Sequence, residues 1–284
     1  MANIGQMFYR HKKFFLFLVG IFFIAGCAYP PLREEKEVSR QIIEKINARR
    51  IGIQSFKGRV QITVNLKGNS PVLTEDIYYQ KPNLLRLDTP GFLGLPFAIL
   101  SYQKEEIFFY LPFSHRCYQG KISLEEFLAP ALGNLGWKGE NFLEGFFSQV
   151  LLIPVQEIVS FKKVIFNGEE NYILETISFS PEVKQKIWVR PPHYLVLRNE
   201  IYDGEEKLVA VWESSDWVET GGIWFARKVS LDWKKENLKL TFSYQTYQIN
   251  PIFSPDFFGN QSTPEETFFW EKIPNLLEFL GGQW

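Results

Sequence analysis

The sequence predicts a mainly β protein built on one long antiparallel sheet. Many short segments alternate apolar and polar residues with a period of two, which is typical of strands with one buried face. Tight-turn pairs such as Asn167-Gly168, Asp203-Gly204 and Gly221-Gly222 separate several of these segments, and strands joined by tight turns run antiparallel. Aromatic residues make up 17% of the chain, with 27 Phe, which favours strands and a large apolar interior.

The N-terminus has the pattern of a secretory signal over residues 1–26. A basic cluster at Arg10–Lys13 precedes an apolar run of 12 residues, Phe14–Ala25, which is shorter than the roughly 20 residues of a spanning helix. The sequence Ile-Ala-Gly-Cys that ends at Cys27 resembles the lipobox of bacterial lipoproteins. This resemblance implies that Cys27 is lipidated and begins the mature chain, with residues 27–31 as a tether. The alternative is an incidental Cys behind an ordinary signal peptide.

Charge and cysteine content narrow the range of partners. Three of the 31 basic residues and none of the 32 acidic ones lie in the signal, so the mature chain is slightly acidic. This argues against nucleic acid as a partner. Lipidation of Cys27 would leave Cys117 unpaired, and no Cys spacing typical of a disulfide framework or a zinc site occurs.

The first half of the chain reads as one helix followed by a meander of strands. Residues 32–50 place apolar side chains at helical spacing, which predicts an amphipathic helix. The stretch 56–67 alternates strictly and predicts a strand with one dry face. Further strands are predicted at about 72–80, 84–88, 97–103 and 106–112.

A helical insert and a second set of strands follow. Ser123 and Glu126 form the pattern of a capping box, and a second helix is predicted from Glu140. The strands return as hairpins over 162–177 and 195–214 and as single strands at 227–233 and 237–249, which makes about 11 strands in all. A sheet of that length with one apolar face must curl or be covered, and few helical segments are available to cover it.

The aromatic-rich tail over residues 261–284 is predicted to be an amphipathic helix. Thr263 is a suitable N-cap, Pro264 fits the first helical position and Glu266 fits the third. Such a helix either docks on the sheet or lies at a membrane interface.

The sequence shows no recognisable catalytic set. Only His115 and His193 remain after the signal, and no nucleophile motif or phosphate-binding glycine motif accompanies them. The pairs of acidic residues mostly sit near Lys or Arg at turns or helix ends, which is typical of solvated surface charge. We therefore expect a protein that is not an enzyme and needs no metal or cofactor.

One turn is unusually apolar. The stretch Thr89–Phe97, TPGFLGLPF, has the Gly and Pro content of a turn but carries large apolar side chains, whereas turn tips are usually small or polar. Either it folds over the end of the sheet or it contacts a membrane. Phe92 and Leu93 form its tip, with Leu95 in support.

The order of these features resembles the LolA/LolB lipoprotein-carrier superfamily over roughly residues 35–260. The strand SFKGRVQITV, the segment YYQKPNLLRLDTPGFLGLPFAIL and the closing YQTYQINPIFSPDFF carry the likeness. It implies that the domain, residues 32–260, is an incomplete antiparallel β-barrel closed by a few helices around an apolar cavity for lipid. The chain is longer than that small fold requires, and its tail has no obvious place there.

With a lipid anchor, the chain is similar to the LolB side of the superfamily. The resemblance implies an outer-membrane protein facing the periplasm, or the cell surface in a single-membraned cell. Its partners would be membrane lipid, the acyl chains of lipoproteins and a soluble LolA-like periplasmic carrier. Phe92, Leu93 and Leu95 would insert into the membrane. The cavity would be lined by Val60, Ile62, Val64, Leu87, Ile99 and Phe109, for which ordinary core is the alternative.

Two other functions stay open at this point. A structural or accessory outer-membrane lipoprotein with a filled core could bind other proteins through an edge strand. An enzyme acting on lipid or glycan is the second, although no catalytic set supports it.

Overall fold

A computed structural model gives the structure of the chain, which divides into two units, Met1–Val38 and Ser39–Trp284. The fold below concerns the second unit. Cys27, the signal and the tether lie outside the described residues, as does most of the tail. The residues that the structure describes are 33–66, 70–124, 126, 139–149, 155, 157–166, 168–179, 182–234, 237–254, 256–259 and 266–269.

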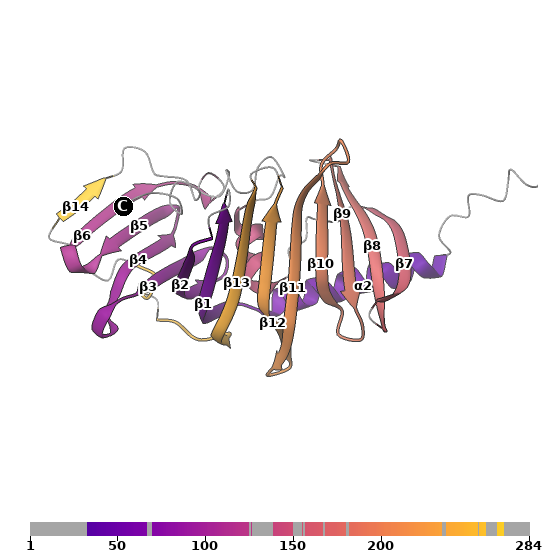
Figure 1. Cartoon of the computed structure of the whole chain (residues 1–284), viewed down its shortest axis with the longest axis horizontal. Coiled ribbons are helices and arrows are strands. Elements are labelled where there is room, and N and C mark those ends of the chain that lie inside the picture. The colour runs from indigo at the N-terminus through magenta and orange to yellow at the C-terminus, as the bar shows by residue number, and fades with distance from the viewer. Residues whose placement is uncertain are drawn as a thin grey trace, which may run out of the picture. The chain divides into compact units, whose positions relative to one another are not determined.

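The described strands form one sheet of fourteen (Figure 1). Their order across the sheet is β14-β6-β5-β4-β3-β2-β1-β13-β12-β11-β10-β9-β8-β7, and every neighbouring pair is antiparallel except β14 and β6. The strands are β1 (Ser55–Leu66), β2 (Val72–Gln80), β3 (Leu84–Pro90), β4 (Pro96–Gln103), β5 (Glu106–Leu111), β6 (Arg116–Lys121), β7 (Glu157–Phe166), β8 (Glu169–Phe179), β9 (Glu182–Arg190), β10 (Leu195–Tyr202), β11 (Leu208–Thr220), β12 (Ile223–Trp233), β13 (Leu238–Ile249) and β14 (Glu266–Phe269).

The sheet consists of two meanders that meet at its centre. One runs from β1 to β6 and the other from β7 to β13, and β1 pairs with β13 from Phe56–Ile249 to Leu66–Leu238. Within the described residues, the edge strands β7 and β14 do not pair with each other, so the sheet is open. This confirms the predicted mainly β fold with an incomplete antiparallel barrel.

Three strands of the structure were not predicted from the sequence: β6, β9 and β14. The β9 pattern was hidden by Gln185, which interrupts the apolar alternation of Val183, Ile187 and Val189 and is nonetheless buried. The helix predicted from Thr263 is wrong at Glu266–Phe269, which pair with β6 in parallel. Its two Phe residues are good strand formers, and the free edge of β6 offers backbone partners.

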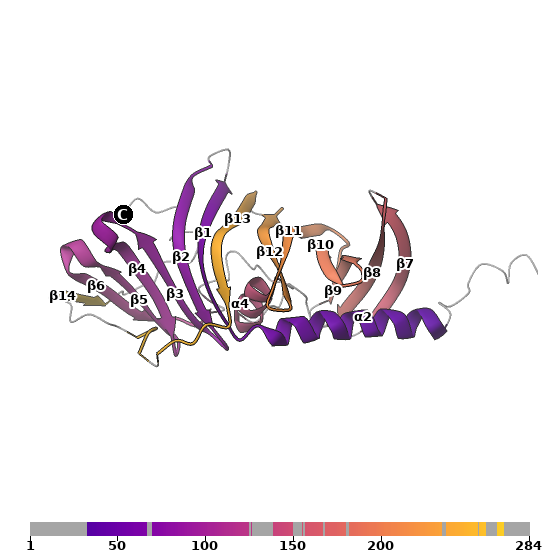
Figure 2. The same cartoon turned by 90° about the horizontal axis from the view of Figure 1, so that it is seen from below.

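Two helices cover one face of the sheet. In Figure 2, α2 (Arg33–Gly52) runs beneath the second meander from Ser39 onward, and α4 (Gly139–Ser148) lies in the curve of the central strands. The predicted apolar positions Ile42 and Ile46 of α2 are fully buried, and Arg49 lies over the Trp217 ring of β11 at 5.2 Å. The Ser123–Glu126 capping box is confirmed, since each residue bonds to the backbone N–H of the other at 3.1 Å.

The opposite face of β2 and β3 is covered by the chain that follows β13. The ring of Phe257 meets the Tyr78 ring edge-on at 4.9 Å, and Arg86 donates a hydrogen bond to the Phe257 carbonyl oxygen at 3.1 Å. Phe258 is fully buried in the same segment. We call this covered side the outer face, and the side that carries α4 the apolar face.

Candidate functional site

Five of the six predicted lining residues lie on the apolar face. Val60, Ile62 and Val64 alternate along β1 and belong to, or pack against, the main core cluster. Leu87 of β3 and Phe109 of β5 reach the same face, because both pair with Leu100 of β4 from either side. Their role in lipid binding stays a prediction.

Ile99 is the exception and lies on the outer face. It pairs with Asp88 and Tyr110, whereas the apolar face of β4 is formed by Ala98, Leu100 and Tyr102. The stretch PFAILSY is apolar at both alternating positions, so its periodicity fits either orientation and only the strand pairing decides between them.

Aromatic side chains from α4 fill the centre of the apolar face. The Phe147 ring stacks on Tyr79 of β2 at 4.4 Å, and the Phe146 ring meets Phe242 of β13 edge-on at 4.6 Å. Phe146 also lies 5.7 Å from Trp212 of β11. Aromatic pairs at these separations add to the stability gained from burial. In this conformation α4 covers the central strands of the apolar face.

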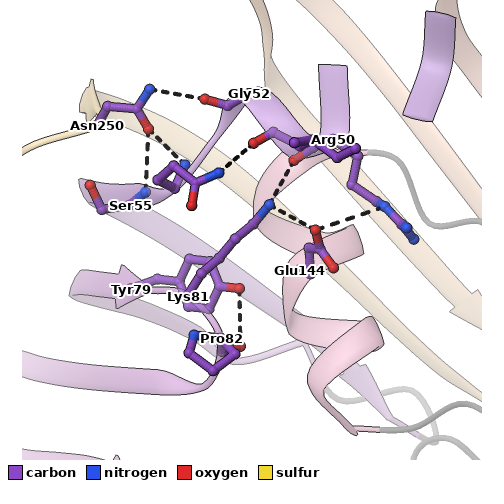
Figure 3. Close-up of polar contacts among 10 residues, drawn as sticks. Arg50, Gly52, Ser55, Tyr79, Lys81, Pro82, Glu144 and Asn250 are labelled. Atoms are coloured by element: carbon purple, nitrogen blue, oxygen red, sulfur yellow. Dashed lines mark hydrogen bonds and ion pairs between the residues drawn. The ribbon is translucent and has the colours of Figure 1, made fainter. Parts of the chain in front are cut away.

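A cluster of polar contacts holds α4 to its neighbours (Figure 3). Lys81 in the β2–β3 turn lies 2.7 Å from Glu144 of α4 and donates to the Arg50 carbonyl oxygen of α2 at 2.9 Å. The Arg50 side chain lies 3.9 Å from the same carboxylate. We call Lys81, Glu144 and Arg50 the α4 latch, because they join three separate elements.

Asn250 fixes the neighbouring backbone at the end of β13 (Figure 3). Its side-chain oxygen accepts from the N–H groups of Gln54 and Ser55 at 2.7 and 3.3 Å, and its amide donates to the Gly52 carbonyl oxygen at 3.0 Å. These bonds tie the last strand of the second meander to the link between α2 and β1. The backbone groups next to the α4 latch are therefore hydrogen-bonded.

The β3–β4 loop presents its apolar side chains to solvent. Phe92 is 75% exposed, Leu93 86% and Leu95 57%. The Leu95 N–H donates to the Phe92 carbonyl oxygen at 3.2 Å, and φ is positive at Leu93 and Gly94, as in the tight turns of hairpins. A Cβ at Gly91 would lie 2.4 Å from the Leu95 carbonyl oxygen, so the chain needs glycine there. The loop does not fold over the end of the sheet.

Leu93 is unusual for its backbone conformation. Its φ of 59° and ψ of 27° lie in the left-handed region, where Gly and Asn are the usual residues and other side chains are disfavoured by about 1 kcal/mol. Neither turn geometry nor burial therefore favours Leu at this position.

Two Phe residues extend this surface beyond the predicted loop. Phe97 at the start of β4 and Phe113 in the β5–β6 turn are each 58% exposed, and their ring centroids are 6.4 Å apart. Phe97 begins the strand as predicted, but Phe113 was missed because β6 was not predicted and its turn was therefore not recognised. We call Phe92, Leu93, Leu95, Phe97 and Phe113 the apolar tip.

The two described His residues lie in different turns of the sheet. His193 stacks on Trp224 at 4.6 Å beside a surface hollow of about 550 Å3, and His115 lies in the β5–β6 turn with φ of 52°. The described residues include no group of three acidic, His or Cys side chains that could hold a metal ion. Every helix in the described part of the chain is too short or too polar to cross a bilayer.

Comparison with known proteins identifies the fold. No family model and no curated protein matches the sequence. The chain is similar to a solved structure described as an outer membrane lipoprotein-sorting protein domain from Vibrio parahaemolyticus. The match covers 77% of this chain and 95% of that one, with 14% identity and a TM-score of 0.53. The chain has a LolA/LolB-like fold.

Two further solved structures were matched to this chain. A DUF1329 family protein from Desulfovibrio piger is similar to 79% of it over 97% of its own length, with 16% identity and a TM-score of 0.55. A LolA superfamily protein from Nitrosomonas europaea is similar to 78% of it over 97% of its own length, with 12% identity and a TM-score of 0.49.

Proposed function

We propose that this protein binds acylated ligands on its apolar face and helps to insert them into the outer membrane, to which Cys27 anchors it. It acts by binding rather than by catalysis. Acyl chains offer only apolar surface, worth about 25 cal/mol per Å2 when buried, so an apolar sheet face binds them without directed contacts. The protein from Vibrio parahaemolyticus, which shares the fold, is described as a lipoprotein-sorting domain, and this supports the same class of ligand.

The observation that carries the proposal is the apolar tip. Five large apolar side chains on two adjacent hairpins are exposed, and Leu93 holds an unfavourable backbone conformation while contacting water. Exposed apolar side chains gathered in one place mark an interaction surface. On a protein tethered by lipid, the nearest apolar partner is the bilayer interior.

The position of α4 supports a mechanism in which the ligand displaces the helix. Phe146 and Phe147 occupy the central apolar face, and the α4 latch holds the helix through Glu144. Opening the latch would exchange aromatic contacts with α4 for contacts with acyl chains. Docking of the tip would then place the opened face beside the membrane that receives the ligand.

A double replacement of Phe92 and Leu93 by Glu tests this function. We expect loss of liposome binding and of the transfer of a diacylated lipopeptide from the protein to liposomes, with an unchanged circular dichroism spectrum. The matched control replaces Ile165 and Phe166 by Glu, since these apolar residues are similarly exposed at the β7–β8 hairpin. Transfer by the tip variant at the native rate would refute the proposal.

The packing of α4 also favours a second candidate, an accessory lipoprotein with a filled core. Val60 and Phe56 are completely buried, and the Phe56 ring lies 5.6 Å from that of Phe147 in α4, as expected of an ordinary interior. Mass spectrometry of the gently extracted protein separates the two functions, because co-purifying lipid supports ligand binding and its absence supports the filled core.

A further inference from the structure

One charged side chain lies on the apolar face of β1 to β5 within the described residues, that of Glu75. The strand register places it opposite Val60 of β1, with Leu73 and Ile77 as its neighbours along β2. An isolated carboxylate is costly among apolar side chains, so a residue of this kind needs a polar partner or a proton.

Thr89 of β3 is the polar partner. Its hydroxyl lies 3.0 and 3.2 Å from the two oxygens of the Glu75 carboxyl group. Thr89 also pairs with Ala98 of β4 and directly precedes the β3–β4 loop. Both side chains are half-buried, so a ligand on the apolar face can reach them. The pair therefore lies at the end of this face that adjoins the apolar tip.

The surroundings of Glu75 favour its neutral form. The pKa of Glu75 is raised to about 7, chiefly by burial, while the Thr89 hydrogen bond lowers it and the carboxylates of Asp76 and Asp88 raise it. Asp76 and Asp88 lie on the outer face, where they pair with Arg59 and Arg86 at 2.7 Å. Below pH 7 the carboxyl group carries a proton and becomes a hydrogen-bond donor.

We propose that the protonated Glu75 carboxyl group, oriented by Thr89, donates a hydrogen bond to an ester carbonyl oxygen of an acylated ligand whose chains lie on the apolar face. This inference rests on the proposed function. Ligand-binding faces of this kind are mostly apolar, with a few polar groups that fix the orientation of the ligand. A diacylglycerol group has its ester carbonyls where the chains meet the polar head, and Glu75 lies where the apolar face meets the membrane-facing loop.

The proposed contact makes ligand binding dependent on pH. A bound acyl ligand removes further water from Glu75, and its ester carbonyl oxygen accepts a hydrogen bond from the protonated carboxyl group. The ligand therefore favours the neutral form of Glu75. Affinity is then full below pH 7 and falls as the pH rises through about 7. With a single linked proton, we expect a loss of about tenfold between pH 6 and pH 8.

Three variants and three probes test the contact in the full chain. The probes are a fluorescent diacyl phosphatidylcholine and its dialkyl ether analogue, which lacks the carbonyl groups, and a diacylated lipopeptide distinguishes a lipoprotein source from a phospholipid source. Glu75→Gln keeps a hydrogen-bond donor without a charge, Glu75→Leu removes the donor, and Thr89→Val removes the hydroxyl. Affinity for each probe is measured from pH 5.5 to pH 8.5.

We expect the native protein at pH 6 to bind the ester about fivefold more tightly than the ether, as one hydrogen bond would provide. Glu75→Gln should keep this preference with no pH dependence, Glu75→Leu should lose both, and Thr89→Val should weaken the preference. Equal binding of ester and ether by the native protein, or the same pH profile in Glu75→Gln, would overturn the contact alone. Failure of every form to bind any probe would instead overturn the proposed function.

Discussion

The ammonium nitrogen of Lys81 lies 2.7 Å from a carboxylate oxygen of Glu144, which joins the β2–β3 turn to α4. Both side chains are largely buried, and Lys81 also donates to the carbonyl oxygen of Arg50 near the C-terminus of α2. A charge-assisted contact of this kind is stronger than a solvent-exposed ion pair. It therefore makes a suitable target for testing whether α4 moves.

Glu144→Gln should loosen α4. Loss of the charge leaves Lys81 without its ion-pair partner, and we expect a stability loss of about 2 kcal/mol with faster hydrogen exchange in α4. Uptake of an acyl probe should also become faster. The control is Glu206→Gln, which breaks the exposed ion pair between Glu206 and Lys184 and should leave exchange in α4 unchanged. Equal exchange in both variants would argue against the α4 latch.

Leu93→Asn separates folding from membrane contact. Asn tolerates the left-handed conformation better than Leu does, so the variant should be as stable as the native protein or gain up to about 1 kcal/mol. Liposome binding should fall, because the most exposed side chain of the apolar tip is lost. Thermal unfolding and liposome flotation measure the two effects, and a loss of stability without a loss of binding would contradict our interpretation.

Phe113→Ser should weaken liposome binding about tenfold. The Phe113 ring lies 6.4 Å from that of Phe97, which follows the β3–β4 loop at the start of β4. Partial burial of one Phe in lipid is worth roughly 1 to 2 kcal/mol. Phe179→Ser is the control, because Phe179 is equally exposed at the β8–β9 hairpin outside the tip. Flotation with identical vesicles compares them, and an equal effect of both changes would remove Phe113 from the tip.

Gly91→Ala should distort the β3–β4 loop. The added Cβ would meet the Leu95 carbonyl oxygen at 2.4 Å, which is a contact with backbone that no side-chain rotation relieves. We expect a stability loss of about 1 to 3 kcal/mol and weaker liposome binding. Gly52→Ala is tolerated in comparison, since nothing lies within 4 Å of the added atom. Calorimetry of both variants gives the difference directly.

Glu75→Gln should remove one part of the dependence of stability on pH. Burial raises the pKa of Glu75 from 4.5 to about 7 in the folded state. Its proton therefore stabilises the fold fully below pH 4.5, and this contribution is lost as the pH rises to 7. Above pH 7 the variant should exceed the native protein in stability by on the order of 1 kcal/mol, after allowance for partial solvent screening. Denaturant unfolding at pH 5 and pH 8 provides the measurement.

The sequence predicted the fold class and the apolar face of β1, because Phe56, Val60 and Val64 alternate with polar residues and one alternation is clearly favoured. It predicted the apolar loop through Gly and Pro spacing. The orientation of Ile99 could not be predicted, since apolar residues occupy both faces of β4. The position of Glu75 on the apolar face could not be predicted either. A single Glu in a strand is typical of a solvent-facing position, and only the pairing with Val60 shows which face it lies on.

The pairing of β1 with β13 has a consequence for how the chain folds. Each meander is built from local hairpins and can form as its own residues become available, but the seam between them joins segments from nearly opposite ends of the domain. Contacts this distant in sequence form late and slowly. A chain exported from its N-terminus would hold β1 with an unpaired edge until β13 arrived. The central edge of the sheet is then open during the most aggregation-prone interval of folding, until the second meander is complete.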